Sequence, residues 1–200
     1  MVTHYQKAYF LLSVADVKQL PPDEGIEVAM VGRSNAGKSS VLNRFTQNKS
    51  LARVSKTPGR TQMVNIFVLD EKRRIADLPG YGFAKAPLSA KLRWQKTVDA
   101  YISERKCLKG LVLVMDIRHP LKDLDRQLLS YCEHRNLPVH ILLNKSDKLS
   151  KLAIRQTIKN VEYILTDYTN SVTFQIFSAT KSIGVEDLYS QLNTWYEYKN

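Results

Sequence analysis

Apolar residues in the second half of the chain are concentrated in short runs that alternate with longer stretches of helical spacing. The short runs, which predict buried strands, cover residues 111–115, 139–143 and 172–177. The longer stretches, which predict helices, follow them at residues 121–135, 151–168 and 185–198. Strands that alternate with helices of this length imply parallel crossovers and a sheet that is covered on both faces.

The first half of the chain predicts a hairpin and one more buried strand. Residues 9–14 and 27–31 are apolar enough for strands, and a helix is expected from Ser40 to about Gln47. Strands are also expected at residues 63–69 and 75–78, with a turn at the charged tetrad 71–74. Residues 48–61 and 80–87 lack apolar periodicity and predict loops, and helical spacing resumes from Leu88. The hairpin makes the predicted sheet mixed but mostly parallel, so the fold class is α/β.

The length of 200 residues fits one α/β domain. We find no repeat or linker, and therefore expect a single domain over residues 1–200, with 1–27 as an N-terminal extension packed on it. The most apolar N-terminal run, residues 8–15, is short and contains a serine, so we expect a cytoplasmic protein without a membrane partner. Cys107 and Cys132 lack ligand spacing and predict buried, reduced thiols.

The connection between the strand at 27–31 and the following helix matches the pattern G-x-x-x-x-G-K-[ST]. It reads Gly32-Arg33-Ser34-Asn35-Ala36-Gly37-Lys38-Ser39, and we call these residues the cradle. Its glycines let the backbone curl so that successive N–H groups face phosphate oxygens, and the helix adds its positive N-terminus. Lys38 is expected to reach the β- and γ-phosphates, and the Ser39 hydroxyl to bind the bridging Mg²⁺.

Two further motifs predict contacts to the γ-phosphate and its metal. Asp77-Leu78-Pro79-Gly80 ends a predicted strand, at the sheet edge where ligands of such folds bind. The Asp77 carboxylate can hold Mg²⁺ through water, and the Gly80 N–H can approach the γ-phosphate. In the loop before the hairpin, the Thr61 hydroxyl can complete Mg²⁺ coordination when a γ-phosphate is present, and Thr57 is its rival.

Two motifs after later strands predict a guanine site. Asn144-Lys145-Ser146-Asp147 follows the run at 139–143. Asp147 can accept from the N1–H and 2-amino groups of guanine, which adenine lacks, and such sites discriminate by roughly 10⁴–10⁵. Lys145 can lie along the base, and Asn144 can tie this loop to the cradle. Ser178-Ala179-Thr180 follows the next strand, where the Ala179 N–H can donate to guanine O6.

Net charge adds a class of partner. The formal charge is +11, and residues 28–69 contain no Asp or Glu but seven Lys or Arg. A second acid-free run, residues 81–98, adds Lys85, Lys91, Arg93 and Lys96. Such clustering indicates a polyanion-binding face. The alternative is a solvated basic surface that only aids solubility.

The ordered motifs resemble those of the translation-factor class of P-loop GTPases. Four longer strings are similar to the EngB (YihA/YsxC) family of bacterial GTPases: GRSNAGKSS at 32–40, SKTPGRTQ at 55–62, DLPGYG at 77–82 and MDIRHPLKDLD at 115–125. The resemblance runs from about Tyr9 to Trp195. It implies a single P-loop GTPase domain that binds GTP or GDP with Mg²⁺, acts in assembly of the large ribosomal subunit and is needed for cell division and septation.

The resemblance also implies site residues. Ser39 and Thr61 would be the Mg²⁺ ligands, which favours Thr61 over Thr57. The remaining nucleotide contacts would be Gly59, Arg60, Gln62, Met63, Asp77, Leu78, Pro79, Gly80, Asn144, Lys145, Ser146, Asp147, Phe177, Ser178 and Ala179.

Hydrolysis is expected to be slow. Many GTPases have a Gln after the Gly of D-x-x-G that orients the attacking water, whereas this chain has Tyr81. We assign catalytic roles to Lys38, Thr61 and Gly80, and no base. Asn35 is a candidate K⁺ ligand by analogy with related GTPases that use K⁺; alternatively, it only braces the cradle.

We expect a monomeric switch whose loops at 48–62 and 80–90 engage ribosomal RNA or proteins of the large subunit or its precursor, with no DNA partner. One alternative is a regulator of septation that acts through a non-ribosomal protein. Another, a small-molecule kinase, has no need of the guanine loop at 144–147.

Overall fold

Seven strands form one sheet in the computed structural model, which describes residues 4–52, 63–82, 88–168 and 172–198. The strands are β1 (Tyr9–Val14), β2 (Ile26–Gly32), β3 (Val64–Val68), β4 (Arg73–Asp77), β5 (Leu108–Asp116), β6 (Val139–Asn144) and β7 (Val172–Ile176). Their order across the sheet is β1-β3-β4-β2-β5-β6-β7. The β1–β3 and β3–β4 pairs are antiparallel and the others are parallel, so the predicted mixed, mostly parallel sheet is confirmed.

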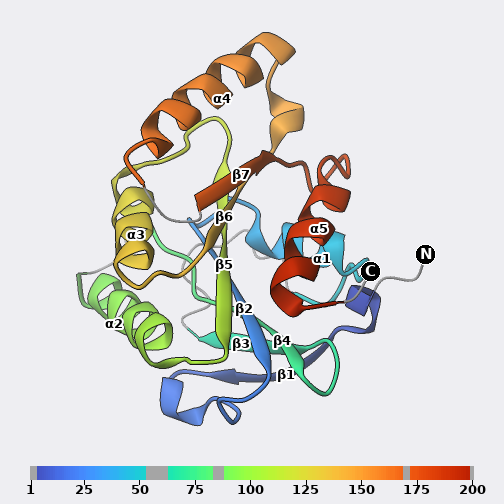
Figure 1. Cartoon of the computed structure of the whole chain (residues 1–200), viewed down its shortest axis with the longest axis vertical. Coiled ribbons are helices and arrows are strands. Elements are labelled where there is room, and N and C mark those ends of the chain that lie inside the picture. Colours follow the sequence, from blue (N-terminus) through green and yellow to red (C-terminus); the bar gives the residue numbers. More distant parts are fainter. Residues whose placement is uncertain (1–3, 53–62, 83–87, 169–171, 199–200) are drawn as a thin grey trace.

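Helices cover both faces of this sheet (Figure 1). They are α1 (Lys38–Phe45), α2 (Leu88–Glu104), α3 (Asp123–His134), α4 (Lys151–Leu165) and α5 (Val185–Tyr196), with short 3₁₀ turns η1 (His4–Lys7), η2 (Val17–Gln19) and η3 (Ser146–Lys148). Helices α2, α3 and α4 pack on one face, and α1 and α5 on the other. None of the helices in the described residues is long and apolar enough to cross a membrane.

The central strands are apolar at most positions between their ends because both of their faces are buried. In β2, Ala29 and Val31 pack toward α2 and α3, whereas Val28 and Met30 pack toward α1 and α5. Successive side chains of a strand point to opposite faces, so a strand between two helix layers needs a continuous apolar run. This constraint is why the short runs at 111–115 and 139–143 predicted buried strands correctly.

The prediction of a turn over the charged tetrad at 71–74 is wrong for its second half. Arg73 and Arg74 were expected in a turn, but both belong to β4. The Arg73 guanidinium donates to the backbone oxygen of Tyr196 (2.6 Å), and that of Arg74 pairs with Glu27 (3.0 Å). These fixed partners hold both residues in the sheet, which a sequence pattern based on charge alone does not reveal.

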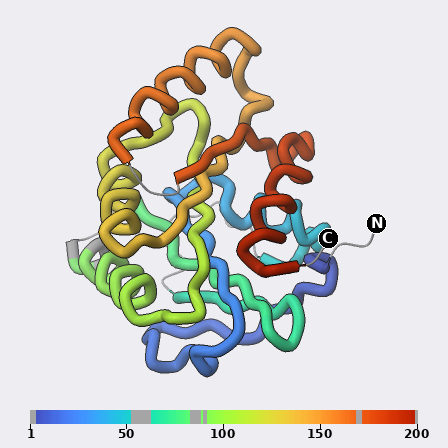
Figure 2. Tube along the Cα trace, viewed as in Figure 1, coloured from blue at the N-terminus to red at the C-terminus, as the bar shows by residue number. Residues whose placement is uncertain are grey.

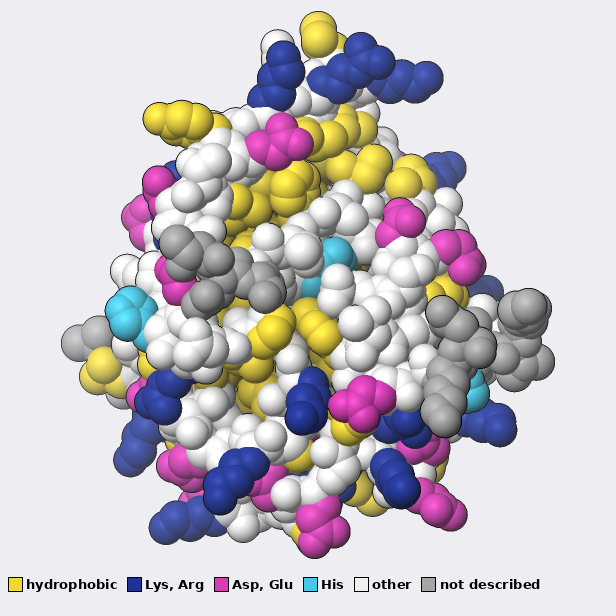
Figure 3. Space-filling view, viewed as in Figure 1, with side chains coloured by type: hydrophobic (Ala, Val, Ile, Leu, Met, Phe, Trp, Pro, Cys, Tyr) yellow, Lys and Arg dark blue, Asp and Glu magenta, His cyan; other side chains and the backbone are white. Residues whose placement is uncertain are grey.

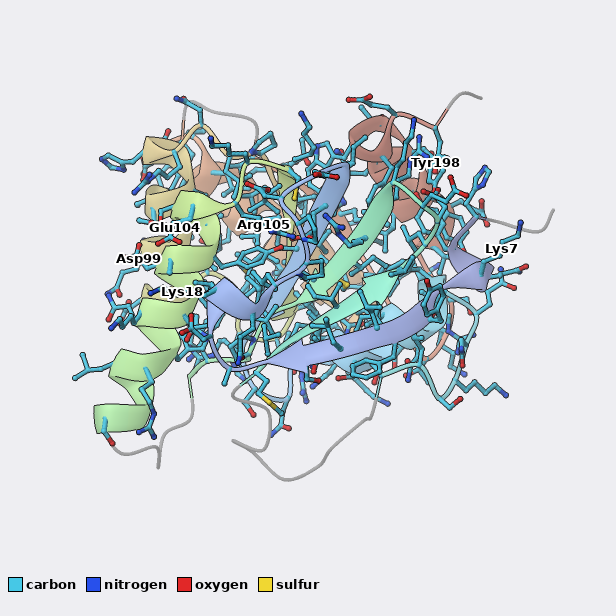
Figure 4. All side chains as sticks on the ribbon, turned by 90° about the horizontal axis from the view of Figure 1, so that it is seen from below. Lys7, Lys18, Asp99, Glu104, Arg105 and Tyr198 are labelled. Carbon is cyan, nitrogen blue, oxygen red and sulfur yellow. The ribbon has the colours of Figure 1, made fainter. Side chains whose placement is uncertain are left out.

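Glu27 is a fully buried carboxylate at the start of β2. Its oxygens accept from Arg74 and Arg105 and from the hydroxyl of Tyr101. Arg105, labelled in Figure 4, follows the end of α2. A buried charge is tolerated when it is paired and hydrogen-bonded in this way. The network fastens α2 to β2 and β4 at the end of the sheet opposite the cradle.

The first and last described segments of the chain, η1 and the residues after α5, lie side by side (Figure 2). The Tyr5 ring is buried, stacks on Tyr189 of α5 (5.2 Å between centroids) and donates a hydrogen bond to Asn193 (2.8 Å). His4 stacks on Tyr198 (4.2 Å). Aromatic packing of this kind joins η1 to α5. The chain then continues from η1 into β1, which pairs with β3.

Cys107 and Cys132 are buried, free thiols, as predicted. Burial is the main cause that raises the pKa of each thiol to about 12. Both groups are therefore neutral at physiological pH, where the reactive thiolate form is scarce.

Candidate nucleotide-binding site

The cradle joins the end of β2 to the first turn of α1. Gly37 caps that helix in a left-handed conformation (φ +96°), and a Cβ there would collide with the side-chain amide of Asn144. At the other end of the cradle, a Cβ on Gly32 would collide with the backbone oxygen of Val114. Both glycines are therefore needed for close approach to β6 and β5, and Gly37 also provides the left-handed conformation. The sequence pattern predicted the glycines but not these neighbours.

Asn144 ties three loops together. Its side-chain NH₂ donates to the backbone oxygen of Ala36 in the cradle (2.8 Å), as the sequence predicts. Its side-chain oxygen accepts from the backbone N–H of Ala179 (3.2 Å). The Asn144 side chain is buried, so these bonds are shielded from water. The Ala179 N–H was expected to donate to guanine O6; in this structure a base oxygen there would compete with the Asn144 amide.

The Lys145 side chain connects the cradle to the end of β5. Its ammonium donates to the backbone oxygen of Asn35 (2.5 Å) and pairs with Asp116 (3.0 Å) at the end of β5. Hydrogen bonds from Arg118 and Lys145 hold the pKa of the Asp116 carboxyl well below its usual range. Lys145 is thus positioned over the cradle edge, and its aliphatic stem is available to a base.

Asp147 is oriented by a neighbouring hydroxyl. Ser178 donates to one carboxylate oxygen (2.5 Å), and Lys148 pairs with the other (3.2 Å). The Ser178 bond is the main cause that lowers the pKa of Asp147, so the carboxylate is ionised at neutral pH. An ionised carboxylate only accepts hydrogen bonds and has several acceptor positions, which suits the two donors on the guanine edge. Ser178 therefore positions Asp147, a role that its place in the motif did not predict.

Several predicted contacts are available only through the backbone. The side chains of Ala36, Leu78 and Phe177 are buried in the two cores, and the Phe177 carbonyl accepts from the N–H of Ser146 (3.1 Å). The Ser146 hydroxyl is buried and has no hydrogen-bond partner among the described residues. Phe177 and Leu78 thus support the loops from beneath.

Lys38 and Asp77 meet at the phosphate end of the site. The Lys38 ammonium donates to one Asp77 oxygen, and the side-chain amide of Asn65 donates to the other (3.3 Å). Asn65 was missed by the sequence analysis, although the hairpin register places it directly opposite Asp77. Ser39 lies in the first turn of α1, next to Lys38. Hydroxyl and carboxylate oxygens are the ligands Mg²⁺ prefers, so Ser39 and Asp77 fit that ion.

The segment after β4 runs alongside the cradle. The Ser34 N–H donates to the Tyr81 oxygen (2.8 Å), the Tyr81 N–H donates to the Gly32 oxygen (3.3 Å), and the bridge between Arg33 and Tyr81 is parallel. A Cβ on Gly80 would lie 3.3 Å from the Gly32 oxygen. Gly80 is therefore pressed against the cradle, where its backbone can face a phosphate bound there.

Two helices hold this segment in place. The Trp94 indole N–H of α2 donates to the Pro79 oxygen (2.7 Å), and the Tyr81 hydroxyl donates to Asp125 of α3 (2.5 Å). The Tyr81 and Trp94 rings are also in contact (5.0 Å between centroids). Tyr81 and Asp125 are both buried, and burial is the main cause that raises the pKa of each. Neither Trp94 nor Asp125 was predicted, because their roles depend on tertiary contacts.

The loop before β3 lies outside the described residues. Gly59, Arg60, Thr61 and Gln62, together with the rival Thr57, are in that part of the chain. Met63, at the edge of the described segment, is exposed (41%). The predicted second Mg²⁺ ligand therefore stays a prediction.

Comparison with known proteins identifies the family to which these features belong. Residues 27–145 match the family described as 50S ribosome-binding GTPases. The probable GTP-binding protein EngB of Aliivibrio fischeri is 52% identical over 193 residues, covering 96% of this chain and 90% of the relative. That of Coxiella burnetii is 50% identical over 192 residues, covering 96% and 94%.

Solved structures show the same fold. A crystal structure of a probable GTP-binding protein EngB matches with a TM-score of 0.69 at 20% identity, covering 86% of this chain and all of that one. Era in complex with MgGDPNP and nucleotides 1506–1542 of 16S ribosomal RNA matches with a TM-score of 0.65 at 20% identity, covering 86% of this chain and 57% of Era.

The substitution Gly37→Ala tests the cradle. Because the added Cβ would displace Asn144, and because a left-handed alanine costs roughly 1–2 kcal/mol, we expect affinity for GTP and GDP to fall at least about 100-fold, or nearly 3 kcal/mol. Gly25→Ala is the matched control: its backbone is also left-handed (φ +74°), and its Cβ would collide with the Lys72 oxygen at the opposite end of the sheet. Both variants should melt earlier in thermal unfolding, but only Gly37→Ala should fail in fluorescent-nucleotide titration. Wild-type affinity in Gly37→Ala would contradict the assignment.

Proposed function

The chain belongs to the EngB family of GTP-binding proteins and is a GTPase, and from this premise we propose that it is a Mg²⁺-dependent switch in assembly of the large ribosomal subunit. The proposal includes a need for the protein in normal cell division and septation. The observation that carries the nucleotide part is the Asn144 side chain, which joins the cradle to the two loops expected to hold guanine.

Phosphate binding would begin with an exchange of partners by Lys38. Its ammonium pairs with Asp77 in the structure, and a bound nucleotide offers it β- and γ-phosphate oxygens instead. Ser39 and Thr61 would hold Mg²⁺ directly and Asp77 through water. The ion would neutralise charge on the phosphates. Gly80, pressed against Gly32, would donate its N–H to the γ-phosphate.

Guanine specificity would reside in Asp147. The carboxylate is half-buried and ionised, and Ser178 fixes one of its oxygens. Adenine offers no donors in the place of N1–H and the 2-amino group, so binding it would leave the carboxylate unpaired at a large cost. Lys145 would cover the base from the cradle side.

Intrinsic hydrolysis would be slow because Tyr81 does not face a phosphate-bound water. Its hydroxyl is committed to the buried Asp125, on the α3 side of the segment. Among the described residues we assign no general base. Positioning and charge stabilisation by Lys38, Gly80 and Thr61 would supply the catalysis.

Asn35 supports a role for K⁺. The residue is exposed in a left-handed conformation (φ +64°), and its side chain makes no hydrogen bond with the residues that the structure describes. The Asn35 side chain therefore does not brace the cradle through a hydrogen bond to a described residue. Its carboxamide oxygen is available to a cation beside the phosphates. A K⁺ ion at that position would act as an arginine finger does.

The ribosomal partner is supported by the family description and by charge. The family matched by residues 27–145 is named for binding to the 50S particle, and Era, which shares the fold, has been solved with ribosomal RNA. The acid-free basic runs at 28–69 and 81–98 include the segments expected to respond to the γ-phosphate. Nucleotide state and binding of rRNA or ribosomal proteins would thus be coupled, in the cytoplasm and with the protein as a monomer.

Co-sedimentation with purified large ribosomal subunits tests this function. The protein is loaded with a non-hydrolysable GTP analogue, with GDP or with no nucleotide, at low and high salt. We expect the most protein in the pellet with the analogue and less with GDP, and a loss of binding at high salt because phosphate contacts release counterions. Small subunits serve as the control particle. Equal pelleting in every nucleotide state would contradict a switch.

The role of K⁺ is tested by GTP turnover in KCl and in NaCl at equal ionic strength. Wild-type protein should turn over at least about tenfold faster in KCl, because one well-placed charge contributes this much or more to the transition state. Asn35→Ala should abolish the difference while GDP affinity stays within a few-fold of wild type. Equal wild-type rates in the two salts would remove K⁺ from the account.

A further inference from the structure

We propose that the exposed face of α4 is a second RNA-binding surface, which contacts RNA phosphates in both the GTP-bound and GDP-bound states. The inference rests on the proposed function, since it assigns a further contact with the same ribosomal partner. The surface, here called the α4 stripe, consists of Lys151, Arg155 and Lys159 with the flanking side chains Leu152 and Tyr163.

The three cations form one line on the helix. They recur every fourth residue, so their side chains share one face at steps of about 6 Å along the axis. All three are exposed, and none makes a hydrogen bond or ion pair with a residue that the structure describes. Figure 3 shows Lys and Arg side chains gathered over α4 at the top of the molecule. Regularly spaced, unpaired cations match the repeating charges of a nucleic-acid backbone.

Two apolar side chains flank the cations. Tyr163 (77%) and Leu152 (66%) have the highest exposed fractions among the large hydrophobic residues of the described chain. At 100° per residue they lie on the same side of the α4 stripe. The helix already has a separate buried face, where Val161 packs into the core with Ile154 and Ile164 beside it. Leu152 and Tyr163 are therefore not required for packing, and an exposed tyrosine ring beside cations is suited to stack on an unpaired base.

RNA fits this surface better than a membrane does. A helix that lies on a membrane inserts a broad apolar face, whereas the apolar face of α4 is turned toward the sheet. Gln156 and Asn160 are also exposed on α4 and offer hydrogen bonds to phosphate, sugar or base. Glu162 is the acidic residue of α4 and is exposed three positions after Lys159, the last cation of the stripe.

The position of α4 makes its contact independent of the γ-phosphate. The helix follows η3, which contains Asp147, and connects β6 to β7. Strands β2, β5 and β6 separate β7 from β4, whose end carries Asp77. The α4 stripe thus adjoins the guanine side of the site, and guanine is the same in GTP and GDP. This surface would hold the protein on RNA while the segments near the γ-phosphate report nucleotide state.

The test compares two triple variants by titration of a fluorescently labelled RNA hairpin at several salt concentrations. Lys151→Gln, Arg155→Gln and Lys159→Gln together remove the cations of the α4 stripe and keep good helix formers. Lys18→Gln, Lys106→Gln and Lys109→Gln remove the same charge from exposed positions elsewhere. Lys18, labelled in Figure 4, lies near the end of the molecule opposite α4. Thermal melting checks that both variants fold.

We expect the α4 variant to bind the hairpin roughly 10–100-fold more weakly and to lower the salt slope by about 2–3, because each lost phosphate contact lowers it by about one. The loss should be the same with GDP and with a GTP analogue, and the control variant should lose much less. Equal losses in the two variants, or no loss in the α4 variant, would overturn the proposal. The same variants are also titrated with phosphatidylglycerol vesicles. If the α4 variant lost affinity for the vesicles but not for the hairpin, the surface would bind lipid and the proposal would be wrong.

Pelleting with large ribosomal subunits separates this inference from the function on which it rests. If wild-type protein does not pellet in any nucleotide state, the proposed function fails. If wild-type and α4-variant proteins pellet equally well, the function stands and the α4 stripe is wrong. Weaker pelleting of the α4 variant by the same factor in the GDP and analogue states would support the inference.

Discussion

The side chain of Asn144 is the interaction on which the arrangement of the site depends. A single buried carboxamide donates to Ala36 and accepts from Ala179, so loops that follow β2, β6 and β7 meet at one point. This contact is close enough to require glycine at position 37, and it places Lys145 over the cradle. A buried amide left without partners would cost free energy, so the folded state favours the joined arrangement of the three loops. The loops proposed to bind phosphate and base are therefore joined in one framework.

The opposite end of the sheet carries a different network with a different purpose. The buried Glu27 pairs with Arg74 and Arg105 and accepts from the buried Tyr101, and this cluster fastens α2 to the sheet away from any predicted ligand. Helix α2 in turn holds the segment after β4 through the Trp94 contact with Pro79. Gly80 lies between this anchor and that of Tyr81 on Asp125. If a γ-phosphate displaced Gly80, the contacts of its neighbours with α2 and α3 would shift as well. The nucleotide state could in this way change the position of helices at the outer surface.

Much of the fold and site could be predicted because the determining features are local. Short runs rich in apolar residues predicted β5, β6 and β7, and the spacing of Gly32, Gly37 and Lys38 predicted the cradle. The missed features depend on partners distant in sequence: Arg73 and Arg74 join β4 because of Tyr196 and Glu27, and Tyr81 turns away from the site because Asp125 receives its hydroxyl. Ser178 shows both cases. Its place in the motif was evident from the sequence, whereas its hydrogen bond to Asp147 could be identified only from the folded structure.

The most direct measurement of the central claim is the affinity of Asn144→Ala for GTP, GDP and ATP, with the free energy of unfolding measured in parallel. The account predicts that affinity for both guanine nucleotides falls at least about 100-fold, more than the loss of one hydrogen bond would cause, because the cradle and the base loops separate together. ATP binding should stay weak, and Asn136→Ala, in the turn after α3, should leave affinity unchanged. Near wild-type affinity for GTP and GDP in Asn144→Ala would contradict the claim that this side chain holds the site together.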